Sequence, residues 1–436
     1  MDATNRRVVR VLMFPWLAYS HIHPFLELAK KLSERNFYIY LCSSPANLGH
    51  IKENLLEMNF PSIQLVELHL PSSPDLPPHY HTTKGLPNHL LGNLMQAFDT
   101  ASSSFSGILT TLRPDLLICD FFQPWAPALA LSLNIPTVQF VVSGNKANSV
   151  AVHAFKKSGV VIQDSAKDFL FIRDRILQHL EQSSGIMLVR SSREIEGKYL
   201  DDLSAVTMKR VLPVGPLVQD PIAEDDKKTE ITEWLNRRDP CSSVIYVAFG
   251  SENYLSKEDR EELALGLLLS NVDFIWVLRF PRGEEISARE ALPEGFIEMV
   301  SERGLIVEEW APQKRILSHP SIGGFLSHCG WGSVLESMKF GVPLIAMPMH
   351  IDQPLNAEFL VEIGVGLEIK RDKNGKIERE EVARVIRDLA GERTGEHLRK
   401  KARELSDCIR DKAGQEIDEV VNDLVHLVGR KTHNPF

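Results

Sequence analysis

Short apolar runs alternate with longer amphipathic segments through most of the chain. In the first half, the strand-like runs are Val8–Phe14, Phe37–Cys42, Ile63–Glu67, Leu116–Cys119 and Thr137–Val142. A helical period follows the first run over Pro24–Leu32, and a longer helical stretch covers Leu86–Leu112. Strands separated by helices in this rhythm predict a parallel sheet that helices cover on both faces.

The alternation breaks once and then restarts, which predicts two domains. Residues 212–229 hold three prolines, one glycine and a charge run, a composition typical of a linker. Beyond it we expect a helix at Lys257–Leu268 and strands at Ser243–Phe249, Phe274–Leu278, Leu305–Val307, Gly324–Leu326 and Leu344–Ala346. The predicted domains are therefore 1–211 and 230–436. Residues 379–428 predict two or three surface helices, and whether the last of them pack back on the first domain stays open.

Composition narrows the class of protein. A chain of 436 residues fits two domains of about 200 residues each. The formal net charge of −9 argues against a broad nucleic-acid-binding face. Five scattered cysteines indicate a reducing compartment, with neither a disulfide framework nor structural zinc. Because no run reaches about 18 apolar residues, we expect no membrane span and a cytosolic protein.

In the first domain, a histidine and an aspartate each follow a predicted strand. His21 lies at the turn after the first strand, and Asp120 directly follows Leu116–Cys119. Because ligands bind beyond the carboxyl ends of parallel strands, both side chains are expected at one cleft. A histidine can take a proton near neutral pH, and a carboxylate behind it fixes its tautomer. Either residue alone is as well explained by the start of a helix.

In the second domain, a glycine-rich turn follows a predicted strand. The turn reads Ser-His-Cys-Gly-Trp-Gly-Ser over Ser327–Ser333 and is expected to open a helix near Ser333. Backbone N–H groups and the positive end of a helix favour an anion there, and a diphosphate fits, with His328 beside it. Two plainer interpretations stay open: a capping box of Ser333 and Glu336, and Asp352 as a helix cap.

The whole segment Trp310–Gln353 resembles the signature box of plant family 1 UDP-glycosyltransferases. It has the right length, opens with Trp310, carries His-Cys-Gly-Trp in its middle and closes with Asp-Gln. The resemblance implies two facing Rossmann-like domains of the GT-B architecture, with the active site in the cleft between them. It also implies a catalytic pair, which His21 and Asp120 match.

The resemblance further implies a donor site for a UDP-sugar. Trp310 would stack on uracil and Gln313 would lie near the uridine, while Glu336 would bind the ribose. Phosphate contacts would come from His328, Ser333 and Ser251. The sugar hydroxyls would be bound by the Trp331 backbone, Asp352 and Gln353, and the closing glutamine favours UDP-glucose. Ala311 and Gly332 complete the expected donor residues.

Two positions depart from the family pattern. Gly332 stands where the family usually has asparagine, so a phosphate-facing amide is missing unless the backbone N–H replaces it. Ser20 stands where glycine usually precedes the catalytic histidine. Ser20, Phe122 and Ser143 are the residues expected at the acceptor. An apolar acceptor wall is expected from a cluster of five aromatic residues, of which at least half should be core: Phe14, Trp16, Phe121, Phe122 and Trp125.

The predicted function is inverting, metal-independent transfer of glucose from UDP-glucose. No Asp-x-Asp motif occurs in the chain, and no cofactor or metal ligand is expected. The segments Leu12–Lys31 and Ser192–Leu200 resemble the family branch that extends existing glycosides, such as those of terpenoids or flavonoids. The resemblance and the charge favour a monomer that binds no nucleic acid. Transfer to free aglycones, a non-catalytic nucleotide-sugar binding protein and a sugar-nucleotide epimerase remain alternatives.

Overall fold

The protein is described by a computed structural model that covers residues 7–156, 166–221, 230–240, 244–251, 253–281, 286–308, 310–412 and 414–431. Contacts divide the chain into two units. Unit 1 contains Met1–Leu217 and Lys412–Phe436, and unit 2 contains Val218–Asp411. The chain therefore passes from unit 1 to unit 2 and returns for its last segment.

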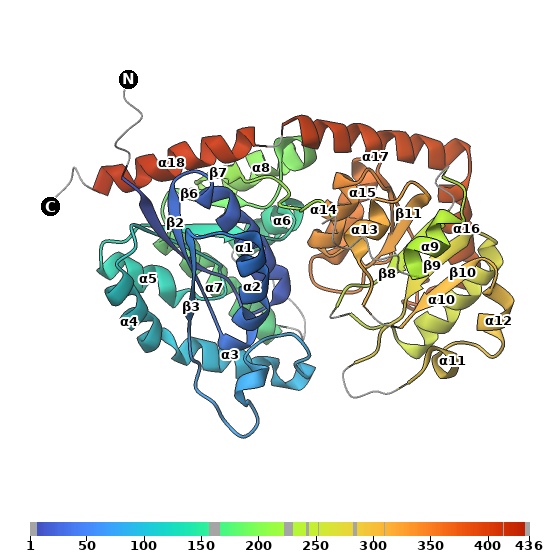
Figure 1. The fold of residues 1–436 in the computed structure, drawn as a ribbon, viewed down its shortest axis with the longest axis horizontal. Coiled ribbons are helices and arrows are strands. Elements are labelled where there is room, and N and C mark those ends of the chain that lie inside the picture. Colours follow the sequence, from blue (N-terminus) through green and yellow to red (C-terminus); the bar gives the residue numbers. More distant parts are fainter. Residues whose placement is uncertain are drawn as a thin grey trace. The chain divides into compact units, whose positions relative to one another are not determined.

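Unit 1 is built on a parallel sheet of seven strands in the order β3-β2-β1-β4-β5-β6-β7. Figure 1 labels β2, β3, β6 and β7 of this sheet. The strands are β1 (Val9–Phe14), β2 (Phe37–Ser43), β3 (Ile63–Glu67), β4 (Leu116–Cys119), β5 (Thr137–Val141), β6 (Ile186–Val189) and β7 (Arg210–Pro213). From β1 the chain adds β2 and β3 on one side of the sheet, and it then adds β4 to β7 on the other side. The carboxyl ends of β1 and β4 form the switch point, where ligands bind in open α/β sheets.

Helices bury both faces of this sheet because side chains alternate along each strand. In β1, Val9, Val11 and Met13 join one core cluster, whereas Leu12 and Phe14 join another. The helices are α1 (Tyr19–Ser33), α2 (Pro45–Met58), α3 (Leu91–Thr100), α4 (Ser102–Leu112), α5 (Trp125–Ser132), α6 (Asn145–Lys156), α7 (Ala166–Gln182), α8 (Arg193–Thr207) and α18 (Gln415–Lys431), with short 3-10 turns η1 (Pro78–Tyr80) and η2 (Asn88–Leu90).

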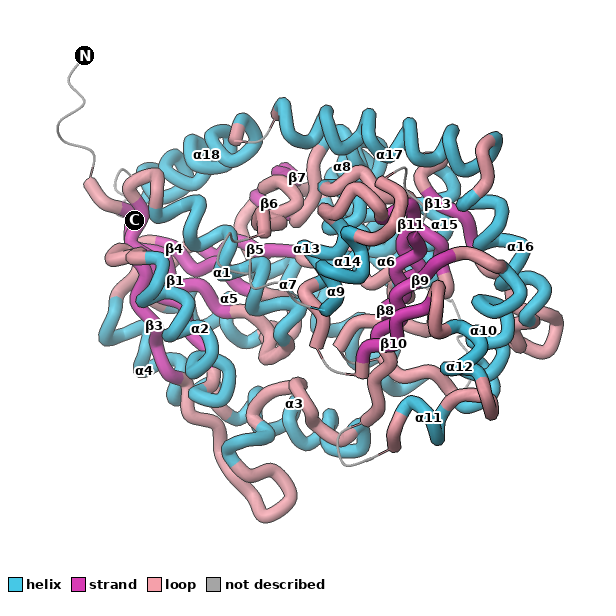
Figure 2. The backbone as a smooth tube through the Cα atoms, turned by 45° about the vertical axis from the view of Figure 1, so that its right-hand side comes forward, coloured by secondary structure: helices cyan, strands magenta, loops and turns pink. Residues whose placement is uncertain are grey.

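Unit 2 repeats the architecture with a parallel sheet of six strands in the order β10-β9-β8-β11-β12-β13. Figure 2 draws the strands in magenta. The strands are β8 (Val244–Ala248), β9 (Asp273–Val277), β10 (Gly304–Val307), β11 (Ile322–Ser327), β12 (Leu344–Ala346) and β13 (Gly366–Glu368). The helices are α9 (Glu230–Asn236), α10 (Lys257–Ser270), α11 (Ala288–Ala291), α12 (Phe296–Val300), α13 (Gln313–Leu317), α14 (Trp331–Lys339), α15 (Gln353–Glu362), α16 (Arg379–Ala390) and α17 (Arg393–Asp411). The predicted α/β class with two Rossmann-like domains is confirmed, and its cleft stays a prediction.

Several elements differ from the sequence-based expectation. Three short strands were missed, β6, β7 and β13, and β7 takes in the first two residues of the expected linker. The linker residues 222–229 lie outside the described parts. The expected helix over 86–112 is broken at Ala101, where α3 ends and α4 begins.

The first helix begins one turn earlier than predicted. Pro24 marked the expected start, because proline favours the first turn of a helix. In the structure Pro24 lies inside α1, which begins at Tyr19, and both His21 and Ile22 donate their backbone N–H to the Ala18 carbonyl. His21 therefore lies in the first turn of α1, directly beyond β1.

Candidate active site

The predicted pair of His21 and Asp120 meets at the switch point of unit 1. Phe14 and Cys119, which end β1 and β4, are register partners, so the residues that follow them emerge side by side. His21 Nδ1 lies 2.5 Å from Asp120 Oδ2, and the backbone N–H of Phe121 donates to Asp120 Oδ1 at 2.7 Å. Both oxygens of the fully buried carboxylate thus have a partner.

This arrangement fixes what the imidazole can do. The Asp120 carboxylate occupies the Nδ1 side of His21, which leaves Nε2 as the nitrogen that can accept a proton. The His21 side chain keeps 18% of its surface exposed, so a substrate can approach it. Phe122 lies edge-on to the imidazole, with 5.5 Å between ring centroids, and also stacks on Trp16. The arrangement is that of a histidine general base, His21, with a carboxylate partner, Asp120.

The two other predicted acceptor residues lie in different surroundings. Ser20 is exposed in the first turn of α1, directly before His21. Ser143 follows β5 and exchanges hydrogen bonds with Asn148, whose amide also donates to the Ser143 and Gly144 carbonyls. Of the five aromatic residues, Phe14 and Trp16 are core, whereas Phe121, Phe122 and Trp125 are partly buried because they follow the end of β4. The expectation that at least half of them are core is therefore wrong.

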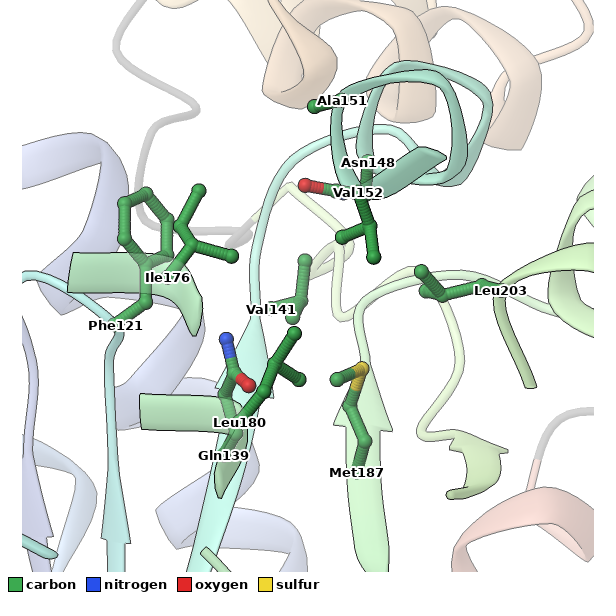
Figure 3. A pocket seen from close by; sticks show the side chains of 10 residues that line it. All are labelled: Phe121, Gln139, Val141, Asn148, Ala151, Val152, Ile176, Leu180, Met187 and Leu203. Atoms are coloured by element: carbon green, nitrogen blue, oxygen red, sulfur yellow. The ribbon is translucent and has the colours of Figure 1, made fainter. Parts of the chain in front are cut away.

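A largely apolar pocket lies next to the loop that follows Asp120, between β5, β6 and the helices α6, α7 and α8 (Figure 3). Its polar groups are Asn148 and Gln139, and Gln139 Oε1 is buried without a hydrogen-bond partner among the described residues. Phe121, next to Asp120, forms part of the wall. The remaining lining residues are Val141, Ala151, Val152, Ile176, Leu180, Met187 and Leu203. Its cavity volume of about 20 Å³ has room for a water molecule and not for a glycoside acceptor.

Glu196 of α8 fixes the start of α6 at the edge of this pocket. Its Oε1 accepts the backbone N–H groups of Asn145 and Lys146, at 2.7 and 3.2 Å, and its Oε2 accepts the Asn145 amide at 2.6 Å. A carboxylate at a helix N-terminus satisfies free N–H groups and matches the helix dipole. Burial raises the pKa of Glu196 to about 7, against the lowering effect of these donors.

In unit 2, the glycine-rich turn lies at the corresponding switch point. Ala248 and Ser327, which end β8 and β11, are register partners. The exposed Ser251 follows β8, and the buried His328 follows β11. A Cβ atom built on Gly250 or Gly330 would lie about 3 Å or less from the His328 imidazole, so both glycines leave room for that ring. The two predicted phosphate contacts thus follow adjacent strands.

His328 is buried in its neutral form. Burial, with a smaller effect from His350, lowers the pKa of His328 to about 4. Its Nδ1 has no hydrogen-bond partner within the described parts of the chain. A neutral imidazole with an unused nitrogen can donate one hydrogen bond to an oxyanion, as the predicted phosphate role requires.

The start of α14 rules out the capping-box interpretation of Ser333. The helix begins at Trp331 with Gly330 as its N-cap, so Ser333 is the third helical residue rather than the cap. The helix therefore also starts two residues before the expected position. The Gln313 amide instead donates to Ser333 Oγ at 3.3 Å and to Glu336 Oε2 at 2.8 Å. Three predicted donor residues thus form one hydrogen-bonded group.

The ends of the signature box differ in exposure. Trp310 has 71% of its surface exposed, an unusual state for an indole ring and one that leaves its face available for stacking. Ala311 is buried, and the Trp331 ring is buried against Phe359. Gly332 is the second residue of α14, so its backbone N–H belongs to the free first turn of the helix.

The closing pair of the box lies at the start of α15. Asp352 occupies the N-cap position, but its side chain makes no capping hydrogen bond and instead accepts from the Asn356 amide at 3.0 Å. Gln353 Oε1 accepts the backbone N–H groups of Met349 and His350, while its amide faces Asn253 Oδ1 at 3.4 Å. The Gln353 amide N–H groups are therefore the part of this side chain that can reach a sugar hydroxyl.

Sequence patterns missed Gln139, Glu196 and Asn253. Gln139 interrupts the apolar run of β5, and Glu196 interrupts the apolar side of α8, so a polar residue at a core position was a usable signal for both. Asn253 had none. Among the described residues, no three His, Cys, Asp or Glu side chains are grouped so that they could hold a metal ion. Likewise, no described helix has the length and apolar character needed to cross a membrane.

Comparisons with known proteins agree with this geometry. Residues 221–421 match the family model of UDP-glucoronosyl and UDP-glucosyl transferase, and residues 7–219 match that of the glycosyltransferase N-terminal domain. UDP-glucosyltransferase 29 of Panax ginseng is 50% identical, over 99% of each chain. Beta-D-glucosyl crocetin beta-1,6-glucosyltransferase of Gardenia jasminoides is 47% identical, over 97% of this chain and 100% of that protein.

A solved structure extends the likeness to three dimensions. Phytolacca americana UGT2, complexed with UDP-2fluoro-glucose and pterostilbene, superposes with a TM-score of 0.80 at 27% identity, covering 97% of this chain and 100% of that one. The matches cover both units from end to end. The chain therefore belongs to the plant family 1 UDP-glycosyltransferases.

Proposed function

We propose that the protein transfers glucose from UDP-glucose to a hydroxyl of a small-molecule glycoside, such as that of a terpenoid or flavonoid, and so extends its sugar chain. The observation that carries the proposal is the 2.5 Å contact between His21 Nδ1 and the buried Asp120 carboxylate at the switch point of unit 1. The relative from Gardenia jasminoides, by its name, adds glucose to an already glucosylated acceptor, which supports the choice of a glycoside.

The proposed reaction is a direct displacement with inversion. His21 Nε2 takes the proton of the acceptor hydroxyl while that oxygen bonds to the anomeric carbon. The bond from this carbon to the diphosphate oxygen breaks, and UDP leaves. Asp120 holds the tautomer and stabilises the imidazolium that forms. The neutral His328, Ser333, Ser251 and the first turn of α14 are proposed to stabilise the departing diphosphate.

The other donor roles are proposed from the resemblance to the family's signature box. Trp310 is proposed to stack on uracil with Ala311 beside it, and Glu336, held by Gln313, to bind the ribose. The Trp331 backbone, Asp352 and the Gln353 amide are proposed to bind glucose hydroxyls, and the Gly332 N–H to replace the missing amide. The surroundings of His21 in unit 1, with Ser20, Phe122 and Ser143, are the proposed acceptor site.

Product analysis tests the proposal. Purified enzyme is given UDP-glucose with a panel of free aglycones and their monoglucosides, while UDP release and product mass are recorded. Gain of one hexose on the glycosides alone is the expected result. Gain on free aglycones alone would keep the transferase and reject the glycoside as acceptor. UDP-glucose binding without any product would indicate a non-catalytic binding protein.

We further propose that transfer needs no metal ion or other cofactor, and that the protein acts as a monomer in the cytosol. An unchanged rate after treatment with EDTA and gel filtration is the expected result for the metal. Restoration of a lost rate by Mg²⁺ or Mn²⁺ would overturn this part. Light scattering during size-exclusion chromatography measures the oligomeric state, and a fluorescent fusion in plant cells reports the compartment.

A further inference from the structure

The loop that carries Asp120 is held from behind by an ion pair that the proposed chemistry does not use. Arg175 of α7 and Asp99 of α3 form it: Arg175 Nη1 donates to Asp99 Oδ1 at 3.0 Å, and Nη2 donates to Oδ2. The Arg175 side chain is 9% exposed and that of Asp99 is 35% exposed. Two parallel hydrogen bonds to one carboxylate fix the guanidinium in position and orientation.

The same pair contacts the Asp120 loop at two points. Arg175 Nη1 also donates to the Phe122 carbonyl at 2.5 Å, and Trp125 Nε1 donates to Asp99 Oδ1 at 3.3 Å. The contacts thus lie two and five residues beyond Asp120. They join the loop to α3 and α7, which lie apart from it in the sequence.

The opposite side of the loop is tied to β1. The Asp120 N–H donates to the Phe14 carbonyl at 3.3 Å, and the Gln123 amide donates to the same oxygen at 2.5 Å. The Phe122 ring, whose carbonyl Arg175 holds, lies edge-on to His21. The loop is therefore clamped between β1 and Arg175, and a shift at Phe122 would disturb both members of the catalytic pair.

We propose that Arg175, oriented by Asp99, is a positioning residue that holds Asp120 and Phe122 against His21. The inference rests on the proposed catalytic role of His21 and Asp120. An ion pair with one buried and one partly exposed member gives little net stability, so geometry explains its presence better than stability does. Arg175 acts through the loop and does not touch the reacting atoms in this scheme.

Three variants test the role of the pair. Arg175→Met removes the donors while keeping a long side chain, Arg175→Lys keeps the charge without the paired geometry, and Asp99→Asn removes the charge of the partner. We expect Arg175→Met to lower kcat roughly 10- to 100-fold, because a misplacement of about 1 Å can cost that much. The KM for UDP-glucose should stay unchanged, and Arg175→Lys should recover part of kcat. Arg173→Gln, in an exposed ion pair on the same helix, is the matched control.

A double-mutant cycle separates positioning from general stability. In the Asp120→Asn background, Arg175→Met should lower kcat by less than about twofold, since the group it positions has lost its charge. An equal loss in both backgrounds would overturn the inference, as would wild-type kcat in all three single variants. Thermal melts identify any variant that fails to fold, and Arg175→Lys and Asp99→Asn then carry the test.

The cycle also distinguishes this inference from the proposed function. Near-normal kcat in Asp120→Asn alone would reject the catalytic pair itself. A large loss in Asp120→Asn together with normal kcat in the Arg175 and Asp99 variants would reject only the positioning role.

Discussion

At the scale of single residues, the Asp120 carboxylate decides which nitrogen of His21 can work. Its contact with Nδ1 leaves Nε2 for the proposed base function, and its complete burial keeps water from competing for that contact. In unit 2, the Gln313 amide holds the Ser333 hydroxyl and the Glu336 carboxylate in place by hydrogen bonds. Burial keeps the nearby His328 of the glycine-rich turn neutral.

Substitution of the catalytic pair should affect the chemical step and leave donor binding intact. His21→Ala and Asp120→Asn should each lower kcat about 10²- to 10⁴-fold, the range for loss of general base catalysis. The Kd for UDP, measured by calorimetry, should not change, because the donor residues belong to unit 2. His23→Ala, in the same helix, is the control and should keep most of the activity. Near-normal transfer by His21→Ala would reject this base.

Gly332→Asn should strengthen donor binding. The substitution restores the side-chain amide that relatives usually carry, and one hydrogen bond to a charged group contributes about 1.5–3 kcal/mol. The KM for UDP-glucose should therefore fall about tenfold or more, since a factor of ten corresponds to about 1.4 kcal/mol. Gly107→Asn, at an exposed helical position with open space around its Cβ position, is the matched control. An unchanged KM would mean that the backbone N–H already serves the phosphate.

At the scale of elements, apolar runs with clear boundaries were predictable, whereas strands without such boundaries and the exact limits of the helices were not. β3, β4 and β12 have the expected limits, because an apolar run with clear polar boundaries marks a buried parallel strand. β13 has only Gly366–Glu368 to mark it, and Pro213 in β7 resembled a linker residue. Pro24 concealed the true start of α1, since a proline inside a helix contradicts the usual rule.

Some residues of the candidate site were predictable from the sequence and others were not. His21, Asp120 and the signature box stand at strand ends, where sequence alone can place a functional residue. Arg175 and Gln139 act from the interior of elements, and their role depends on which distant segment packs against them. Such contacts between residues more than 50 positions apart, as between Arg175 and Phe122, leave no local pattern to read.

Glu196→Gln should loosen the start of α6 and change the pH dependence of stability. An amide cannot accept all three N–H donors, so we expect a loss of about 1–3 kcal/mol in the free energy of unfolding. The folded pKa is raised from 4.5 to about 7. Between these values the unfolded chain releases a proton that the folded chain keeps, so this group makes stability fall as pH rises.

The wild-type advantage over Glu196→Gln should therefore shrink as pH rises from about 4.5 to about 7. Thermal unfolding of both proteins across this range measures it. Asp202→Asn, at an exposed position of the same helix, should show no such trend. A constant gap between wild type and Glu196→Gln would contradict the proton linkage.

At the scale of the whole molecule, the last helix belongs to the first unit. Ile417, Val420 and Leu424 of α18 are buried in the unit 1 core, where α18 packs on β7 and α1 (Figure 1). Arg210 adds ion pairs to Glu419 and Asp423, and Arg35 adds one to Asp418. The stability of unit 1 thus depends on residues at the far end of the sequence.

Leu424→Ala should destabilise unit 1 selectively. Truncation of a fully buried leucine costs about 2–5 kcal/mol, whereas Val425→Ala, its neighbour with 42% exposure, should cost little. Hydrogen exchange followed by mass spectrometry should show faster exchange in β1 to β7 and unchanged exchange in β8 to β13. Equal acceleration in both sheets would show that the two units unfold together.

The return of the chain to unit 1 has a consequence for recombining relatives. A chimera with a single junction near Leu217 would pair the first sheet with a foreign α18, whose buried residues and ion-pairing carboxylates evolved against another surface. An exchange with two junctions, near Leu217 and Lys412, would transplant unit 2 with the proposed donor residues and keep unit 1, with the proposed acceptor residues and its own α18. Donor and acceptor preferences should then be inherited as separate traits, which makes this chain a modular starting point for new sugar–acceptor combinations.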